Sequence, residues 1–125
     1  MGPIAKQAFE QAIADAHAAR QRGELEVAFA ALERAHVLGQ RDTWAHLRSH
    51  GMMLCIGWLR RDAREAWGQI TRLLAAALFS RVWVPAGNTG GANVSALRRM
   101  PIDADLQAVL KADAASRRGF WATLG

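Results

Sequence analysis

Residues 23–59, GELEVAFAALERAHVLGQRDTWAHLRSHGMMLCIGWL, contain two helical patterns joined by one short turn. Apolar residues of the first pattern recur at the i, i+3, i+4 spacing of a helix: Leu25, Ala28, Phe29 and Leu32. Gly39 is a favourable C-terminal stop for the first helix, and Asp42 is a natural N-cap for the second. Because so short a connection joins helices that are adjacent in space, the two helices are expected to form an antiparallel hairpin.

The sequence on either side adds one further helix to each end of this pair. Apolar residues at helical spacing predict helices over 4–21 and 62–79. Asp62 is followed three residues later by Glu65, a pattern typical of a capping box at a helix start. Residues 1–80 are therefore expected to hold four main helices.

The remaining third of the chain has a different character. Residues 81–102 are rich in Gly and Asn and are expected to form a loop, with residues 82–85 extended. Residues 103–125 are expected to form a short helix, ending near 112, and a tail in which Phe120 and Trp121 pack on the core. The length favours a single domain, 1–125, of the all-α class.

Composition limits the setting of the protein. A single cysteine, Cys55, cannot form an intramolecular disulfide, and the apolar runs are far shorter than the ~20 residues that span a bilayer. These features predict a cytoplasmic protein without membrane insertion. The formal net charge is +5, but the arginines are spread among acidic residues along the chain, which disfavours a nucleic-acid partner. The composition is compatible with either a monomer or a homo-oligomer.

The two predicted hairpins resemble each other. Residues align at a constant offset: Gly23, Leu25, Ala28, Phe29 and Leu32 align with Arg61, Ala63, Ala66, Trp67 and Ile70. The segment GELEVAFAALERAHVLGQ resembles the second half of a tetratricopeptide repeat, although Gln40 stands where that repeat usually has Pro. We therefore expect two stacked antiparallel helix hairpins, in a repeat-like or four-helix arrangement, followed by the loop and the short C-terminal helix.

Three longer segments, LERAHVLGQRDTWAHLRSHGMML, GQITRLLAAALFS and VPAGNTGGANVSALRRMPI, resemble an uncharacterised bacterial family of short helical proteins, a domain of unknown function. The resemblance covers most of the chain. Genes of that family often lie near heavy-metal resistance or efflux genes, so the resemblance implies a role with metals. It supplies no catalytic residues.

The candidate metal ligands lie in one short window around the turn at 40–41. Glu33 and His36 share one face of the first helix, and His46 and His50 share one face of the second. An antiparallel hairpin places His36 beside His46, and Glu33 near His50. Three imidazoles and one carboxylate would suit a divalent transition metal, Zn first, with Ni, Co, Cu and Fe as the other candidates. The alternative is that His36 and His46 hydrogen-bond each other or Glu33 inside the helix stack, while His50 occupies a core position.

The Gly/Asn-rich loop offers a weaker candidate site for an anion. Its backbone and Arg98 could bind a phosphate at five positions: Asn88, Gly90, Gly91, Asn93 and Arg98. It lacks the Lys-Ser/Thr pair of a phosphate-binding loop, so a structural loop that covers the helices or the metal site is favoured. His17 is expected at the surface, and the five tryptophans mostly in the core, with Trp44 as a wall of the site.

These patterns support three functions in descending order. The first is metal buffering, sensing or delivery by a cytoplasmic metal-binding protein. The second is a repeat-like module that binds a protein partner without metal. The third is a metal-dependent enzyme with one ligand position left to water.

Overall fold

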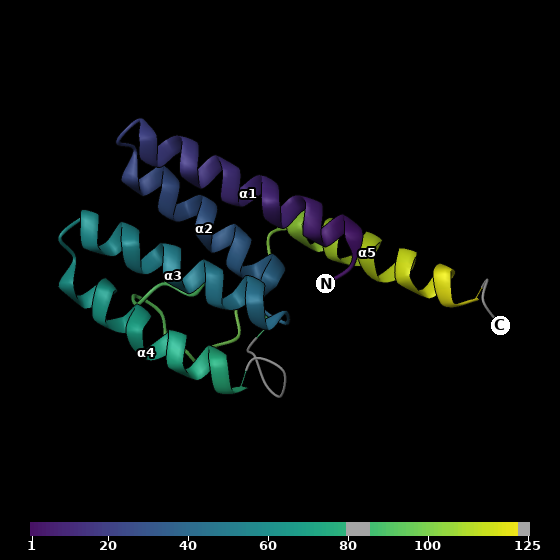
Figure 1. Cartoon of the computed structure of the whole chain (residues 1–125). Coiled ribbons are helices and arrows are strands. Elements are labelled where there is room, and N and C mark those ends of the chain that lie inside the picture. Colours follow the sequence, from purple (N-terminus) through teal and green to yellow (C-terminus); the bar gives the residue numbers. More distant parts are fainter. Residues whose placement is uncertain (80–85, 123–125) are drawn as a thin grey trace.

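Five α-helices make up the computed structural model, which describes residues 1–79 and 86–122 (Figure 1). They are α1 (Pro3–Gln21), α2 (Leu25–Gly39), α3 (Thr43–Leu59), α4 (Ala63–Phe79) and α5 (Ala104–Ala122). The described residues contain no strand, so the predicted all-α class is confirmed. No helix among them combines the length and apolar character needed to cross a bilayer.

The first four helices lie side by side in chain order, each antiparallel to the one before it (Figure 1). They form two hairpins, α1–α2 and α3–α4, which meet where α2 packs against α3. The expected stack of two hairpins is thus confirmed. The core lies mainly between α1, α2 and α3, around Phe9, Leu32 and Met53.

The turns of the two hairpins have the same geometry. In the first, Gly23 adopts a positive φ of 75°, and the amides of Gly23 and Glu24 donate to the carbonyls of Arg20 and Ala19. At the equivalent positions of the second turn, Arg61 has a φ of 55°, and the amides of Arg61 and Asp62 donate to the carbonyls of Trp58 and Gly57. This pair of hydrogen bonds around one left-handed residue defines a Schellman end.

The fifth helix lies beside the N-terminal part of α1 and then extends beyond the other helices (Figure 1). Its Asp113 carboxylate is buried and accepts hydrogen bonds from the amides of Gly2 and Ala5, both at 3.0 Å. Asp113 therefore caps the start of α1, a contact between the two ends of the chain that helix-end patterns did not predict.

Two predictions need correction. The last helix is not short, because α5 has 19 residues and continues to Ala122. The tryptophans of α3 and α4 are not core residues: Trp44, Trp58 and Trp67 are 81%, 76% and 69% exposed. They lie on helix faces that no neighbouring helix covers. The predicted extended segment at 82–85 and the side chains of Phe120 and Trp121 lie outside the described residues.

Candidate metal centre

Three histidines from α2 and α3 meet in the interior of the helix stack. His36, His46 and His50 are only 2%, 7% and 3% exposed. Their ring centres are 4.7 to 4.9 Å apart, pair by pair. One ring nitrogen from each of them lies within 4.8 Å of the others. The predicted convergence of these three side chains is therefore present.

The local sequence explains this convergence. His46 and His50 are one turn apart on α3, and His36 lies in the last turn of α2, across the short connection. Gly39 lets the two helices approach closely, because a Cβ there would lie 2.7 Å from the Cβ of Ala45 and 3.0 Å from the ring of Phe9. The side chain of Asp42 accepts a hydrogen bond from the amide of Ala45, as predicted for an N-cap, and fixes the start of α3.

Hydrogen bonds determine which nitrogen is protonated in two of the rings. His36 Nδ1 lies 2.9 Å from the carbonyl oxygen of Asn88, which can only accept, so Nδ1 carries the proton. His50 Nδ1 lies 2.6 Å from Gln69 Oε1, and the Gln69 amide nitrogen donates to the Glu65 carboxylate and the Gly90 carbonyl. Gln69 therefore presents an acceptor to His50. In both neutral rings the lone pair is on Nε2, the atom left to bind a metal.

The inner nitrogens of the cluster are short of partners. His50 Nε2 lies 3.1 Å from His46 Nε2. His36 Nε2 and His46 Nδ1 are buried without a hydrogen-bond partner. A buried polar atom left unsatisfied costs about 1–3 kcal/mol. A cation bound between the rings would give the lone pair of His36 Nε2 a partner.

The protein interior keeps these rings neutral. Burial lowers the pKa of His46 to about 4. Burial, helped by the nearby His46, lowers the pKa of His50 to about 3. Burial and the two neighbouring rings hold the pKa of His36 well below its usual value. At neutral pH all three are imidazoles, the form that binds metal ions.

The Gly/Asn-rich loop covers the cluster. A Cβ at Gly90 would lie 2.9 Å from the His36 ring, so only glycine allows the loop to pack this closely. Gly90 also has a φ of 86°. The amide of Ala92 donates to both oxygens of Glu65, at 3.0 and 2.9 Å. Loop, α4 and histidines thus form one connected network.

The loop residues predicted to bind an anion are arranged around internal contacts. The Asn88 side chain donates to the carbonyls of Ser95 and Arg98 and accepts from the amide of Gly90. Asn93 and Arg98 are exposed, and Gly91 is buried. The backbone amide of Ala92 in this loop donates to the carboxylate of Glu65, a negative group that belongs to the protein itself. An external anion at this loop stays a prediction.

Glu33 lies beside the cluster but is not one of its three members. Its carboxylate is half-buried and hydrogen-bonds Thr89, and burial raises its pKa. A Cβ at Gly91 would lie 3.3 Å from Glu33 Oε1, so the carboxylate faces the same loop that covers His36. Its role as a fourth ligand stays a prediction.

Two residues that hold the rings in place are not among the predicted site residues. Glu65 lies in the predicted capping box, and its amide donates to Asp62 Oδ1, but its carboxylate faces the loop. Gln69, which is 0% exposed, has no predicted role. One signal could have found both: Glu65, Gln69 and Arg72 form a polar stripe at i, i+4, i+7 on a largely apolar helix.

Fold and site together define a class of protein: an all-α stack of helix hairpins with three buried, metal-competent histidines. The chain belongs to the family described as "Protein of unknown function (DUF3703)", whose model matches residues 4–110. The expected domain of unknown function is thereby confirmed. The matched segment includes the three histidines, Gln69 and the loop that covers them. No curated protein and no solved structure matches the chain.

Proposed function

We propose that the protein is a cytoplasmic metal-binding protein that holds one divalent transition metal ion through His36, His46 and His50. One observation carries the proposal: three buried imidazoles converge, and hydrogen bonds from outside the cluster turn two Nε2 lone pairs inward. Structural histidines that only fill a core have no need of such an arrangement, which instead leaves two nitrogens unsatisfied.

The dimensions of the cluster support a common metal. Ligand nitrogens about 2.0–2.1 Å from a tetrahedral zinc ion lie about 3.3 Å from each other. The His46 and His50 Nε2 atoms are 3.1 Å apart. Rings bound in this way have centres about 5 Å apart, close to the spacings of 4.7 to 4.9 Å in the cluster. One nitrogen from each ring lies within 4.8 Å of the others, so the rings would rotate to bring all three to the spacing of a zinc site.

The donor set favours zinc, followed by cobalt, nickel, copper and iron. Imidazole is a good ligand for all of them, whereas Mg²⁺ and Ca²⁺ prefer oxygen. Glu33 is the proposed fourth ligand, because its half-buried carboxylate lies at the loop over the site. Its negative charge would partly balance a divalent cation in this interior.

Burial favours binding over catalysis. The three rings are at most 7% exposed, and the loop lies directly on His36. A substrate would need the loop to move before it could reach the ion. Retention of the ion itself, for buffering, sensing or delivery, requires no such access.

The test is metal content and affinity of the purified chain. Wild type should bind one Zn²⁺ or Co²⁺ per chain, and the Co²⁺ complex should show the visible absorption of a tetrahedral nitrogen site. His46→Ala/His50→Ala should bind at least about 100-fold more weakly, a larger loss than substitution of a ligand's hydrogen-bond partner produces. Glu33→Gln should bind more weakly than wild type if the carboxylate is a ligand.

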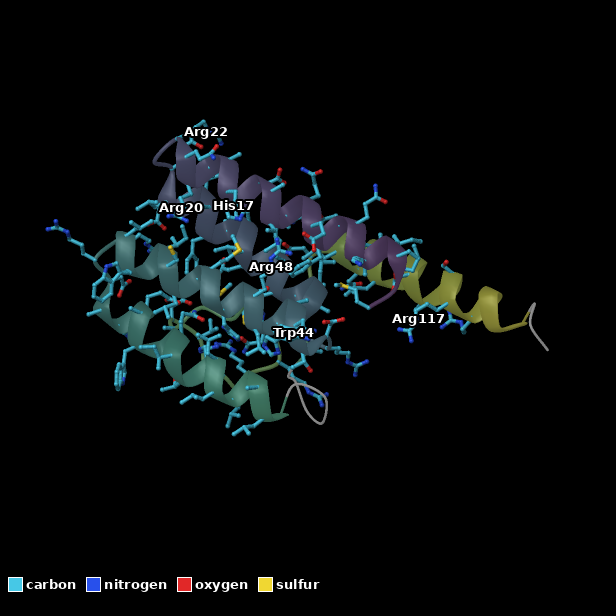
Figure 2. All side chains as sticks on the ribbon, viewed as in Figure 1. His17, Arg20, Arg22, Trp44, Arg48 and Arg117 are labelled. Atoms are coloured by element: carbon cyan, nitrogen blue, oxygen red, sulfur yellow. The ribbon has the colours of Figure 1, made fainter. Side chains whose placement is uncertain are left out.

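His17→Ala is the matched control. His17 is an exposed histidine on α1 (Figure 2) and is not one of the three cluster members, so its loss should leave metal affinity unchanged. Circular dichroism checks that each variant is helical. Equal metal affinity of wild type and the double variant would overturn the proposal.

A further inference from the structure

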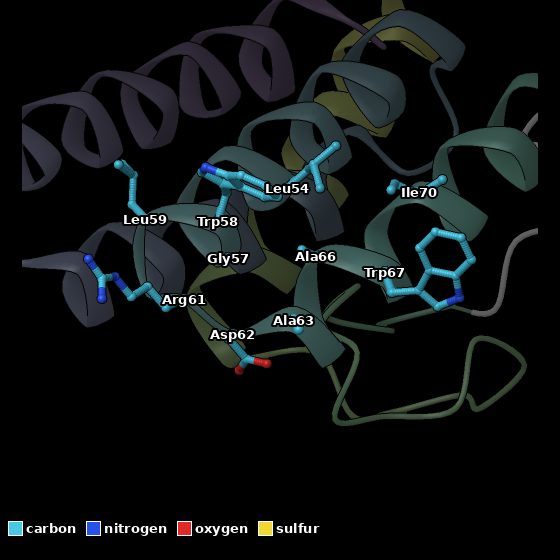
Figure 3. Close-up of a pocket in the computed structure, with 10 residues that line it drawn as sticks. All are labelled: Leu54, Gly57, Trp58, Leu59, Arg61, Asp62, Ala63, Ala66, Trp67 and Ile70. Carbon is cyan, nitrogen blue, oxygen red and sulfur yellow. The ribbon is translucent and has the colours of Figure 1, made fainter.

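The outer face of the α3–α4 hairpin carries large apolar side chains that no other described part of the chain covers. This outer α3–α4 face consists of Leu54 and Trp58 from α3 and Trp67, Ile70, Leu74 and Leu78 from α4. Trp58, Trp67, Leu74 and Leu78 are 76%, 69%, 65% and 72% exposed. An open hollow of about 770 Å³ lies between the helices on this face. Figure 3 shows Trp58, Trp67, Leu54 and Ile70 around it, with Arg61 and Asp62 at the end where the two helices join.

The internal repeat indicates what kind of structure this face fits. Phe29 and His36 of α2, and Gln40 directly after it, are buried, at 8%, 2% and 6% exposure. The residues of α4 at the same constant offset are Trp67, Leu74 and Leu78. In the first hairpin this helix face lies against α3 and the loop. In the second hairpin no helix among the described residues packs on the equivalent face. A further helix in the place of α3 would complete the stack.

The exposed area matches the size of a protein dimer interface. Each exposed Trp offers somewhat less than the 150–250 Å² that a fully buried aromatic contributes. With the leucines and Ile70, the outer α3–α4 face presents roughly 700 Å² of apolar surface, close to the ~800 Å² that each partner of a standard interface buries. A monomer rarely exposes a contiguous apolar patch of this size.

The charge distribution favours a second copy of this chain as the partner. Residues 49–59 of α3 contain no Asp, Glu, Lys or Arg, and residues 66–79 of α4 contain only Arg72. Arg72 donates to the carbonyl of Val94 and so turns toward the loop. The chain as a whole has a net charge of +5. A contact through this nearly uncharged face places no like charges of the two copies directly against each other.

We infer that the protein forms a two-fold symmetric dimer through the outer α3–α4 face. The α3–α4 hairpins of the two copies then make a four-helix layer, in which each supplies the helix that the other's α4 lacks. The same surface patch is used on both copies, as two-fold symmetry requires. This inference is independent of the metal site, which lies on the inner side of the hairpin.

Sedimentation velocity of the full chain tests the inference. A chelator is present throughout, so that a metal ion cannot bridge two chains. Wild type should sediment as a dimer at micromolar concentration. Trp67→Glu/Leu74→Glu places charge at the centre of the interface, and the dissociation constant of the dimer should rise by at least about 100-fold.

Val27→Glu is the control variant, because Val27 is an apolar side chain of α2 that is 55% exposed and lies outside the face. It should remain a dimer. On dilution of wild type, tryptophan emission should shift to longer wavelength as Trp58 and Trp67 become exposed to water. A wild-type monomer throughout the micromolar range would overturn the inference. So would a helical Trp67→Glu/Leu74→Glu variant that dimerises as tightly as wild type.

Discussion

Gln69 links α4, the loop and His50 through a single side-chain amide. Its oxygen accepts from His50 Nδ1, and its nitrogen donates to Glu65 and to the Gly90 carbonyl. Such outer partners fix the tautomer and orientation of a metal-binding imidazole. Gln69 is therefore expected to act on metal affinity without touching the ion.

We expect Gln69→Met to lower Zn²⁺ affinity by about 10–100-fold, because His50 Nδ1 loses its acceptor while the volume of the side chain is kept. Competition titration against a chromophoric chelator measures the change. Gln7→Met, at an exposed position on α1, is the control and should bind as wild type does. An unchanged affinity in Gln69→Met would show that Gln69 only fills space.

The buried histidines should make the metal-free protein sensitive to mild acid. In the unfolded chain a histidine has a pKa near 6.5, whereas in the folded chain the pKa of His46 is about 4 and that of His50 about 3. Between these values the unfolded state binds more protons. The free energy of unfolding therefore has its full value above pH ~6.5. It falls as the pH decreases toward ~4, by up to about 1.4 kcal/mol per pH unit for each histidine.

Urea unfolding of the metal-free chain at about pH 7 and about pH 5 measures this loss. His46→Ala/His50→Ala removes two of the titrating groups and should lose much of the dependence. The same unfolding free energy at both pH values in wild type would contradict the prediction.

At the scale of elements, the two hairpin turns differ in one residue that matters. Both place a left-handed residue at the end of the first helix, but this residue is Gly23 in one turn and Arg61 in the other. A non-glycine residue in this conformation costs about 1–2 kcal/mol. The second turn is thus less well suited to its own geometry than the first.

Arg61→Gly should raise the free energy of unfolding by about 0.5–1 kcal/mol, because relief at the positive φ outweighs the greater freedom of glycine in the unfolded chain. Gly23→Ala should lower it by about 1 kcal/mol, and no atom lies within 4 Å to add a clash. Urea unfolding of both variants tests the pair. A less stable Arg61→Gly would mean that the Arg61 side chain makes a contribution larger than the backbone strain.

At the scale of the whole molecule, the histidine site joins three helices and the loop. α2 and α3 supply the rings, α4 supplies Gln69 and Glu65, and the loop supplies the Asn88 carbonyl and the Ala92 amide. An ion bound to the folded state alone stabilises it by about 2.7 kcal/mol at a concentration 100 times the dissociation constant. Metal should therefore stabilise the loop together with the helices.

Hydrogen exchange with and without Zn²⁺ tests this coupling. The amides of Gly90 and Ala92 both bond within the network, so exchange over 86–95 should slow on metal binding. The second half of α5, which extends away from the site (Figure 1), is the internal control and should not change. Slowing in α5 alone, or no slowing in the loop, would contradict the prediction.

The sequence by itself determined the first four helices and brought the three histidines together. Apolar spacing, Gly39 and Asp42 define α2 and α3, and both helix periodicity and a short turn are local properties of the chain. His36, His46 and His50 lie so near this turn that the hairpin alone makes them neighbours. Local rules therefore sufficed for these helices and these three residues, but not for the length of α5.

Only the tertiary structure decided what surrounds the site and which surfaces stay open. Gln69 and Gly90 reach the histidines from α4 and from the loop beyond it, and Asp113 caps α1 from the far end of the chain. Trp67 and Phe29 hold equivalent positions in similar apolar patterns, yet Trp67 is exposed and Phe29 is buried. Periodicity shows that a helix has an apolar face, but whether another helix covers that face depends on packing between distant segments, which no local pattern encodes.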